Sequence, residues 1–151
     1  MLAKDIMTRD VITVSPEDKV EEVARLLVEN KISGIPVVGE ERQLLGIITE
    51  KDLIVKASEL KVPFYLILFD SIIFMDNPLR FNSDMKKYSA SRVRDAMTTR
   101  VVTVEEDTEV SKVVEIMQND SINRVPVLRH GKLVGIITRN DILKSLVRSN
   151  G

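Results

Sequence analysis

Two periodicities of hydrophobic and polar residues alternate along the chain, and together they predict a mixed α/β fold. The stretches at 10–14, 35–38 and 44–49 are short, apolar and rich in β-branched residues, which favours strands. After the first stretch, four apolar residues recur at helical spacing and predict one apolar helix face: Val20, Val23, Ala24 and Leu27. Ser15 fits the N-cap of that helix and Pro16 its first position. A closing helix begins at residue 50, so the predicted order is strand, helix, strand, strand, helix.

This pattern occurs twice. Three segments return in the same order: "DIMTRDVITV" at 5–14 as "DAMTTRVVTV" at 95–104, "ISGIPVV" at 32–38 as "INRVPVL" at 122–128, and "LLGIITEKDLI" at 44–54 as "LVGIITRNDIL" at 133–143. Matching segments in a constant order indicate an internal duplication. We therefore assign a first repeat to 1–57, an insertion to 58–92 and a second repeat to 93–151. We expect two β-α-β-β-α repeats that bury their apolar faces against each other about a pseudo-twofold axis.

The insertion contains all six aromatic residues of the chain. Its segment 63–75, "PFYLILFDSIIFM", is interrupted by Asp70, and its apolar span of about 14 residues is too short for a bilayer, which needs about 20. Spacing from Pro63 onward predicts a helix that is apolar on more than one side. Such a helix needs two surfaces to bury against. A dimer interface, a cover over the core, a lid over a cleft and contact with an unknown effector protein all remain open.

Composition excludes several kinds of site. The chain has no cysteine, so disulfides, thiolate zinc sites and cysteine nucleophiles are excluded. The chain has a single histidine, His130, which argues against a metal centre or a histidine-based triad. His130 lies in a turn that we expect to be exposed. With 22 basic and 23 acidic side chains the net charge is −1, which provides no field for nucleic acid or a membrane. The N-terminus lacks an apolar signal region, so we expect a cytoplasmic protein. The sequence shows no nucleophile–base pair, metal-ligand cluster or Walker-type loop, so we expect no catalytic activity.

The sharpest repeated motif is Gly-Ile-Ile-Thr-x-x-Asp, which occurs at 46–52 and again at 135–141. Thr-x-x-Asp at the start of a helix is a variant of the capping box, and capping alone explains it in structural terms. The same geometry can also bind a ligand, because a helix N-terminus favours phosphate and a carboxylate can accept ribose hydroxyls. The two interpretations are compatible.

Three motifs in each copy resemble those of CBS (cystathionine-beta-synthase) domains: the "MT…VxTV" start, the "I-x-x-hydrophobic-P-V" strand and "GIIT-x-x-D". The whole chain resembles a stand-alone tandem pair, or Bateman module. The resemblance implies a regulatory binding module for adenosine-containing ligands (AMP, ADP, ATP or S-adenosylmethionine) and no catalytic cofactor. It implies one cleft built from Thr138, Asp141 and Arg124 with Ile32, Ser33, Gly34 and Pro36. The other cleft would use Thr49 and Asp52 with Ile122, Asn123, Val125 and Pro126, and residues near Met7, Thr8, Met97 and Thr98 would close both.

The copies differ in charge near the implied clefts. Arg124 replaces Gly34, and Arg139 replaces Glu50. We therefore expect the Asp141 cleft to be the better phosphate site. The alternative is a structural dimerisation module whose clefts hold no physiological nucleotide, and a homodimer is expected in either case. Stacking of single-stranded nucleic acid on the aromatic residues is a further alternative, which the lack of basic residues in that segment opposes.

Overall fold

The computed structural model of the chain describes residues 1–59, 87–88 and 90–149. The helix expected at 63–75 lies outside these residues. Within the described ranges, no helix combines the length and the apolar character needed to cross a membrane. The chain divides into two compact units, which we call unit 1 (residues 1–12, 40–44 and 101–151) and unit 2 (residues 13–39 and 45–100).

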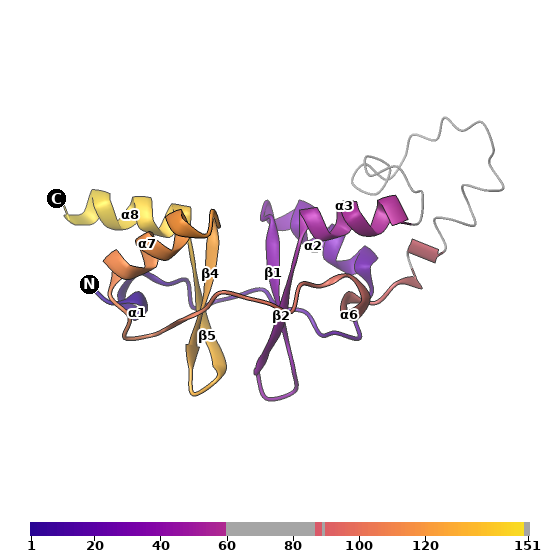
Figure 1. Cartoon of the computed structure of the whole chain (residues 1–151), viewed down its shortest axis with the longest axis horizontal. Coiled ribbons are helices and arrows are strands. Elements are labelled where there is room, and N and C mark those ends of the chain that lie inside the picture. The colour runs from indigo at the N-terminus through magenta and orange to yellow at the C-terminus, as the bar shows by residue number, and fades with distance from the viewer. Residues whose placement is uncertain (60–86, 89, 150–151) are drawn as a thin grey trace. The chain divides into compact units, whose positions relative to one another are not determined.

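Unit 1 is a three-stranded sheet covered by helices (Figure 1). Its elements are α1 (Ala3–Ile6), β3 (Val104–Glu105), α7 (Val110–Asn119), β4 (Arg124–Arg129), β5 (Lys132–Thr138) and α8 (Arg139–Ser149). The strand order is β3-β4-β5, with β3 parallel and β5 antiparallel to β4. Its core consists of buried side chains from the sheet, α7 and the N-terminal segment: Ala3, Met7, Val104, Val113, Met117, Val125, Val127 and Ile137.

The hairpin between β4 and β5 has its turn at His130 and Gly131. Both residues have positive φ, 50° and 77°, which a two-residue hairpin turn requires and which glycine adopts without a steric penalty. The flanking residues Arg129 and Lys132 are paired across the hairpin. The expected turn and the exposure of His130 are confirmed.

Unit 2 contains the corresponding elements of the first repeat. They are α2 (Val20–Asn30), β1 (Gly34–Val38), β2 (Leu44–Thr49) and α3 (Glu50–Glu59). Unit 2 also contains α6 (Val93–Ala96), which belongs to the start of the second repeat. The four residues predicted to form the apolar face of the first helix are all buried in α2: Val20, Val23, Ala24 and Leu27. The predicted strands at 35–38 and 44–49 and the closing helix are confirmed as β1, β2 and α3.

Two predictions at the start of the repeat are wrong. The strand expected at 10–14 is reduced to a single parallel bridge between Val14 and Val37, and its counterpart β3 has only two residues. Ser15 does not cap α2, which begins only at Val20. Instead, the backbone N–H of Ser15 donates to the Asp18 carboxylate at 2.9 Å, and the Asp18 N–H donates to the Ser15 carbonyl at 3.1 Å. These bonds close a separate turn, so the helix starts one turn later.

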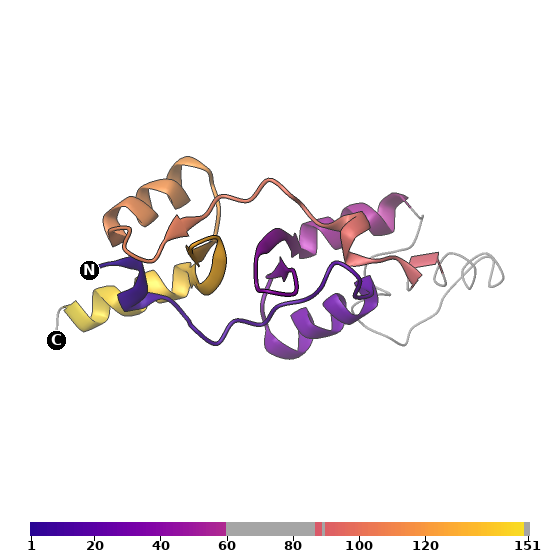
Figure 2. The same cartoon turned by 90° about the horizontal axis from the view of Figure 1, so that it is seen from below.

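The segments that begin the two repeats are exchanged between the units. We call residues 1–8 and 91–98 the leaders. The first leader packs in unit 1, where the Ala3 N–H donates to the Thr108 carbonyl at 2.7 Å. The second packs in unit 2, where the Val93 N–H donates to the Asp18 carbonyl at 2.8 Å. Accordingly α1 lies along α8, and α6 lies against α3 (Figure 2). Each unit therefore combines the body of one repeat with the leader of the other.

Candidate functional site

In unit 1 the Thr-x-x-Asp motif forms a capping box where β5 passes into α8. One carboxylate oxygen of Asp141, Oδ2, accepts the Thr138 backbone N–H at 2.9 Å and the Thr138 hydroxyl at 3.1 Å. The Asp141 N–H donates back to Thr138 Oγ1 at 3.4 Å. These reciprocal bonds satisfy donors that the first turn of the helix leaves free, as the capping-box interpretation predicts.

The other carboxylate oxygen of Asp141 is bound by a leader. Thr8 donates its hydroxyl to Asp141 Oδ1 at 3.0 Å, although the two residues are 133 positions apart in the sequence. The leader is held there by two backbone bonds, Thr8 N–H to the Ile136 carbonyl at 2.8 Å and Ile136 N–H to the Thr8 carbonyl at 2.9 Å. The carboxylate therefore joins the start of α8 to the first leader.

Unit 2 repeats this arrangement. Asp52 Oδ2 accepts the Thr49 N–H at 2.9 Å and the Thr49 hydroxyl at 3.1 Å, and Asp52 Oδ1 accepts the Thr98 hydroxyl at 2.9 Å. Thr98 and Ile47 exchange backbone bonds of 2.8 and 2.9 Å. Two sites with the same donors and the same carboxylate geometry thus exist in one chain.

The motif glycines allow the leaders to approach. A Cβ on Gly46 would lie 2.7 Å from the Thr98 carbonyl oxygen, and one on Gly135 would lie 2.8 Å from Met7 Cγ. The backbone contact leaves no room for a side chain at position 46, whereas a side chain at position 135 would require the Met7 side chain to move. The glycine of "GIIT-x-x-D" therefore lets the leader cross closely, most strictly at Gly46, which the sequence alone did not indicate.

The two carboxylates differ in their surroundings. Asp141 is 8% exposed and is one of the few buried polar residues of the described chain, whereas Asp52 is more exposed. Beside Asp141, a cavity of about 380 Å³ opens between α1 and α8, and Thr8, Lys144 and Ser145 also line it. The position of Ser145 corresponds to Lys56 in unit 2, whose longer side chain is largely covered.

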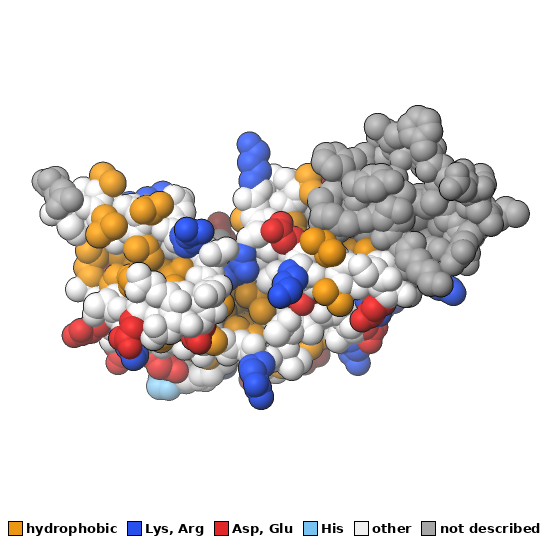
Figure 3. Space-filling model, turned by 45° about the horizontal axis from the view of Figure 1, so that its top comes forward, with side chains coloured by type: hydrophobic (Ala, Val, Ile, Leu, Met, Phe, Trp, Pro, Cys, Tyr) orange, Lys and Arg blue, Asp and Glu red, His pale blue; other side chains and the backbone are white. Residues whose placement is uncertain are grey.

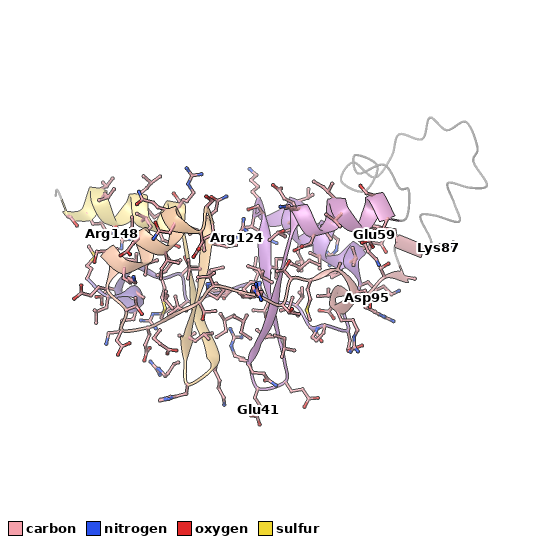
Figure 4. All side chains as sticks on the ribbon, in the orientation of Figure 1. Glu41, Glu59, Lys87, Asp95, Arg124 and Arg148 are labelled. Carbon is pink, nitrogen blue, oxygen red and sulfur yellow. The ribbon has the colours of Figure 1, made fainter. Side chains whose placement is uncertain are left out.

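Two basic residues lie near the start of α8 in unit 1 and have no basic counterpart in unit 2. Arg124 begins β4 and is the cross-strand partner of Thr138, so it lies at the strand end that carries the capping box (Figure 4). Arg139 is the first residue of α8 and is exposed. Its N–H donates to the Asn123 carbonyl at 3.1 Å, which ties the start of α8 to the start of β4.

The predicted site residues separate into two groups. Unit 1 holds Met7, Thr8, Ile122, Asn123, Arg124, Val125, Pro126, Thr138 and Asp141. Unit 2 holds Ile32, Ser33, Gly34, Pro36, Thr49, Asp52, Met97 and Thr98. The structure brings each Thr-x-x-Asp box together with one leader and with the "I-x-x-hydrophobic-P-V" segment of its own repeat. The clefts implied by the family resemblance combine residues of both units and stay predictions.

Within each unit the "I-x-x" segment lies beside the closing helix. The Glu50 N–H donates to the Ser33 carbonyl at 3.0 Å, as the Arg139 N–H does to Asn123. Gly34, Pro36, Val125 and Pro126 are buried in the strands that follow. Sequence reasoning did not predict which leader meets which box. The only signal was the shared Met-Thr and Gly-Ile-Ile-Thr pattern, which does not specify the partner.

The family model described as CBS domain matches residues 3–59 and 93–148. The chain belongs to the CBS domain family. It is 33% identical over 155 residues to the uncharacterized protein MJ1426 of Methanocaldococcus jannaschii, covering 97% of this chain and 92% of that protein. Two other curated relatives are longer, and the chain spans 60% of one and 23% of the other.

Solved structures of the family share this fold. The CBS domain pair of protein MJ0100, in complex with 5′-methylthioadenosine and S-adenosyl-L-methionine, is 27% identical with a TM-score of 0.70, covering 99% of this chain and 98% of that chain. CBSX2 in complex with AMP is 24% identical with a TM-score of 0.76, covering 99% and 98%. At that identity the likeness to CBSX2 shows the fold alone. The expected α/β fold with two CBS repeats is confirmed.

Proposed function

We propose that this protein is a regulatory module that binds adenosine-containing ligands, such as AMP, ADP, ATP or S-adenosylmethionine, and acts by binding rather than by catalysis. The observation that carries the proposal is the carboxylate at the start of α8 and of α3. Each is oriented by its capping box and lies where a ribose hydroxyl could reach it from the helix N-terminus. The complex of the MJ0100 domain pair with methylthioadenosine and S-adenosyl-L-methionine supports the ligand class.

We further propose that the two carboxylates serve unequal sites. Arg124, next to Thr138 across the sheet, and Arg139, at the first turn of α8, would contact phosphate near Asp141. Unit 2 has Gly34 and Glu50 at these positions, which favours a flat adenine but offers no cation. Phosphorylated ligands should therefore prefer Asp141, and uncharged adenosine should distinguish the two sites less.

Isothermal titration with AMP, ADP, ATP, S-adenosylmethionine and 5′-methylthioadenosine tests the proposal. The informative variants are Asp52→Asn and Asp141→Asn, alone and together, because asparagine keeps an acceptor for the capping N–H. Asp18→Asn is a matched control, since Asp18 also accepts a backbone N–H three residues before it, in the turn at Ser15. Ligand binding to the native state should also raise the melting temperature of the wild type.

We expect the double variant to lose affinity by about 10- to 100-fold, the range for a hydrogen bond to a charged group. Asp18→Asn should bind as the wild type does. Asp141→Asn should weaken AMP more than Asp52→Asn, and the reverse order would refute the unequal assignment. If the wild type binds none of the five compounds, the ligand-sensing function is wrong and a purely structural module is favoured.

We also propose that two copies of the chain associate. Hydrophobic side chains gather on the visible face of unit 1 over α7 and α8 (Figure 3). On α8, Leu143 is 60% exposed, Leu146 57% and Val147 75%, and on α3, Ile54 and Val55 are exposed as well. Adjacent exposed apolar side chains on one helix are typical of protein–protein contacts. A homodimer would bury them, and contact of the 63–75 segment with an effector protein is an additional proposal.

A further inference from the structure

Two threonines of the leaders already occupy the carboxylates to which the proposed function assigns ribose. Thr8 donates to Asp141 Oδ1 at 3.0 Å, and Thr98 donates to Asp52 Oδ1 at 2.9 Å. Both threonines are exposed to solvent. The capping boxes do not need these bonds, because Thr138 and Thr49 satisfy their helices through Oδ2. The leader hydroxyls therefore do not serve helix capping, but each uses one acceptor position on the carboxylate.

Each carboxylate has a limited number of positions at which it can accept a hydrogen bond. An ionised carboxylate accepts about four hydrogen bonds, two at each oxygen. Oδ2 of Asp141 already accepts two from Thr138, so it has no capacity left. Oδ1 accepts one from Thr8 and keeps one position. The same count holds for Asp52, with Thr49 and Thr98 as the donors.

A ribose presents two neighbouring hydroxyls, the 2′ and the 3′. One of them can take the open position on Oδ1, but the second finds no acceptor site on the carboxylate while the leader threonine is bound. We propose that Thr8 and Thr98 compete with the second ribose hydroxyl, and thereby set how strongly this protein distinguishes ribonucleotides from deoxyribonucleotides. The inference rests on the proposed function, since it assumes that the carboxylates bind the sugar.

The local structure lets the hydroxyls yield without loss of the leaders. The Thr8 backbone is held to Ile136 by two hydrogen bonds of 2.8 and 2.9 Å, and the Thr98 backbone is held to Ile47 in the same way. Rotation about χ1 would therefore release the hydroxyl while the leader stays in place. The released Thr8 hydroxyl can bind water, because the cavity of about 380 Å³ between α1 and α8 opens beside it. The competition should therefore change the free energy of ribose binding by about that of one hydrogen bond.

Titration calorimetry with AMP and with 2′-deoxy-AMP tests the proposal. The test variant is the double substitution Thr8→Val and Thr98→Val, which keeps the shape of each side chain and removes the hydroxyl from both sites. The matched control is Thr8→Ser with Thr98→Ser, which keeps the hydroxyl. A thermal melt of each variant verifies folding, and Thr8→Ala with Thr98→Ala replaces the valine pair if that pair fails to fold.

In the valine variant both positions on Oδ1 are open, so AMP gains a second hydrogen bond while 2′-deoxy-AMP does not. We expect the ratio of AMP affinity to 2′-deoxy-AMP affinity to rise about tenfold, the low end of the range for one hydrogen bond to a charged group. The serine variant should keep the wild-type ratio. A side chain that only supported the fold would change the affinity for both nucleotides equally.

An unchanged or lower ratio in the valine variant, with AMP still bound, would overturn the competition and leave the proposed function intact. Equal weakening of both nucleotides would also overturn it, because that result shows the threonines assisting the ligand. Failure of the wild type to bind AMP, 2′-deoxy-AMP or any other adenosine compound would instead overturn the proposed function, and the competition with it.

Discussion

The close passage of each leader over a motif glycine leads to a quantitative prediction for Gly46→Ala. The new Cβ would lie 2.7 Å from the Thr98 carbonyl oxygen and 3.2 Å from Met97 Sδ. The first contact is with backbone, which is held by the bonds between Thr98 and Ile47 and cannot swing away. Overpacking of this kind costs about 1–3 kcal/mol. Alanine regains about 0.5–1 kcal/mol over glycine in a strand, and the middle values of the two ranges give a net loss of about 1 kcal/mol.

The matched comparison is Gly135→Ala in unit 1. There the closest atoms belong to the Met7 side chain, and the nearest backbone atom, the Thr8 carbonyl oxygen, is 3.1 Å away. Methionine is flexible and can change rotamer, so this substitution should cost less than Gly46→Ala. In thermal denaturation, Gly46→Ala should lower Tm by about 2–4 °C. Hydrogen exchange at the Thr98 amide should become faster, since its bond to the Ile47 carbonyl must lengthen. A larger loss for Gly135→Ala, or a gain for Gly46→Ala, would refute this reasoning.

Three further predictions concern single groups. The Tyr88 hydroxyl is buried without a hydrogen-bond partner among the described residues, and burial raises its pKa above the ordinary range; Tyr88→Phe should therefore raise Tm by about 2–6 °C, and a lower Tm would reveal a partner. Arg129 donates two bonds of 2.7 Å that lower the pKa of the Glu106 carboxyl. The pair should stabilise the fold above the ordinary glutamate pKa and lose this effect as pH falls through the lowered value, and NMR titration should show a higher Glu106 pKa in Arg129→Met. If the exposed face of α8 forms a dimer, Leu146→Asp should yield monomers in light scattering while Val102→Asp, at another exposed site, should not.

Much of the fold and of the candidate site could be predicted from local patterns. The apolar face of α2, the paired strands of each hairpin and the turn at His130 and Gly131 depend on side-chain periodicity and on turn residues close together in the chain. The capping boxes at Thr49 and at Thr138 were predicted for the same reason, because donor and acceptor are three residues apart. The helix start at Ser15 was wrong, since Asp18 satisfies the local donors in a turn that ends before the helix.

The sequence by itself determined that the chain is a duplicated CBS pair and that each copy ends in a capped helix with a carboxylate in its first turn. Only the tertiary structure decided that the leaders are exchanged, so that Thr8 reaches Asp141 and Thr98 reaches Asp52. The reason is physical. Both leaders contain Met-Thr, and both repeats contain the same glycine and carboxylate. The local sequence therefore does not distinguish a leader that pairs with its own repeat from one that pairs with the other repeat. The choice between them depends on packing within each unit, which no short pattern encodes.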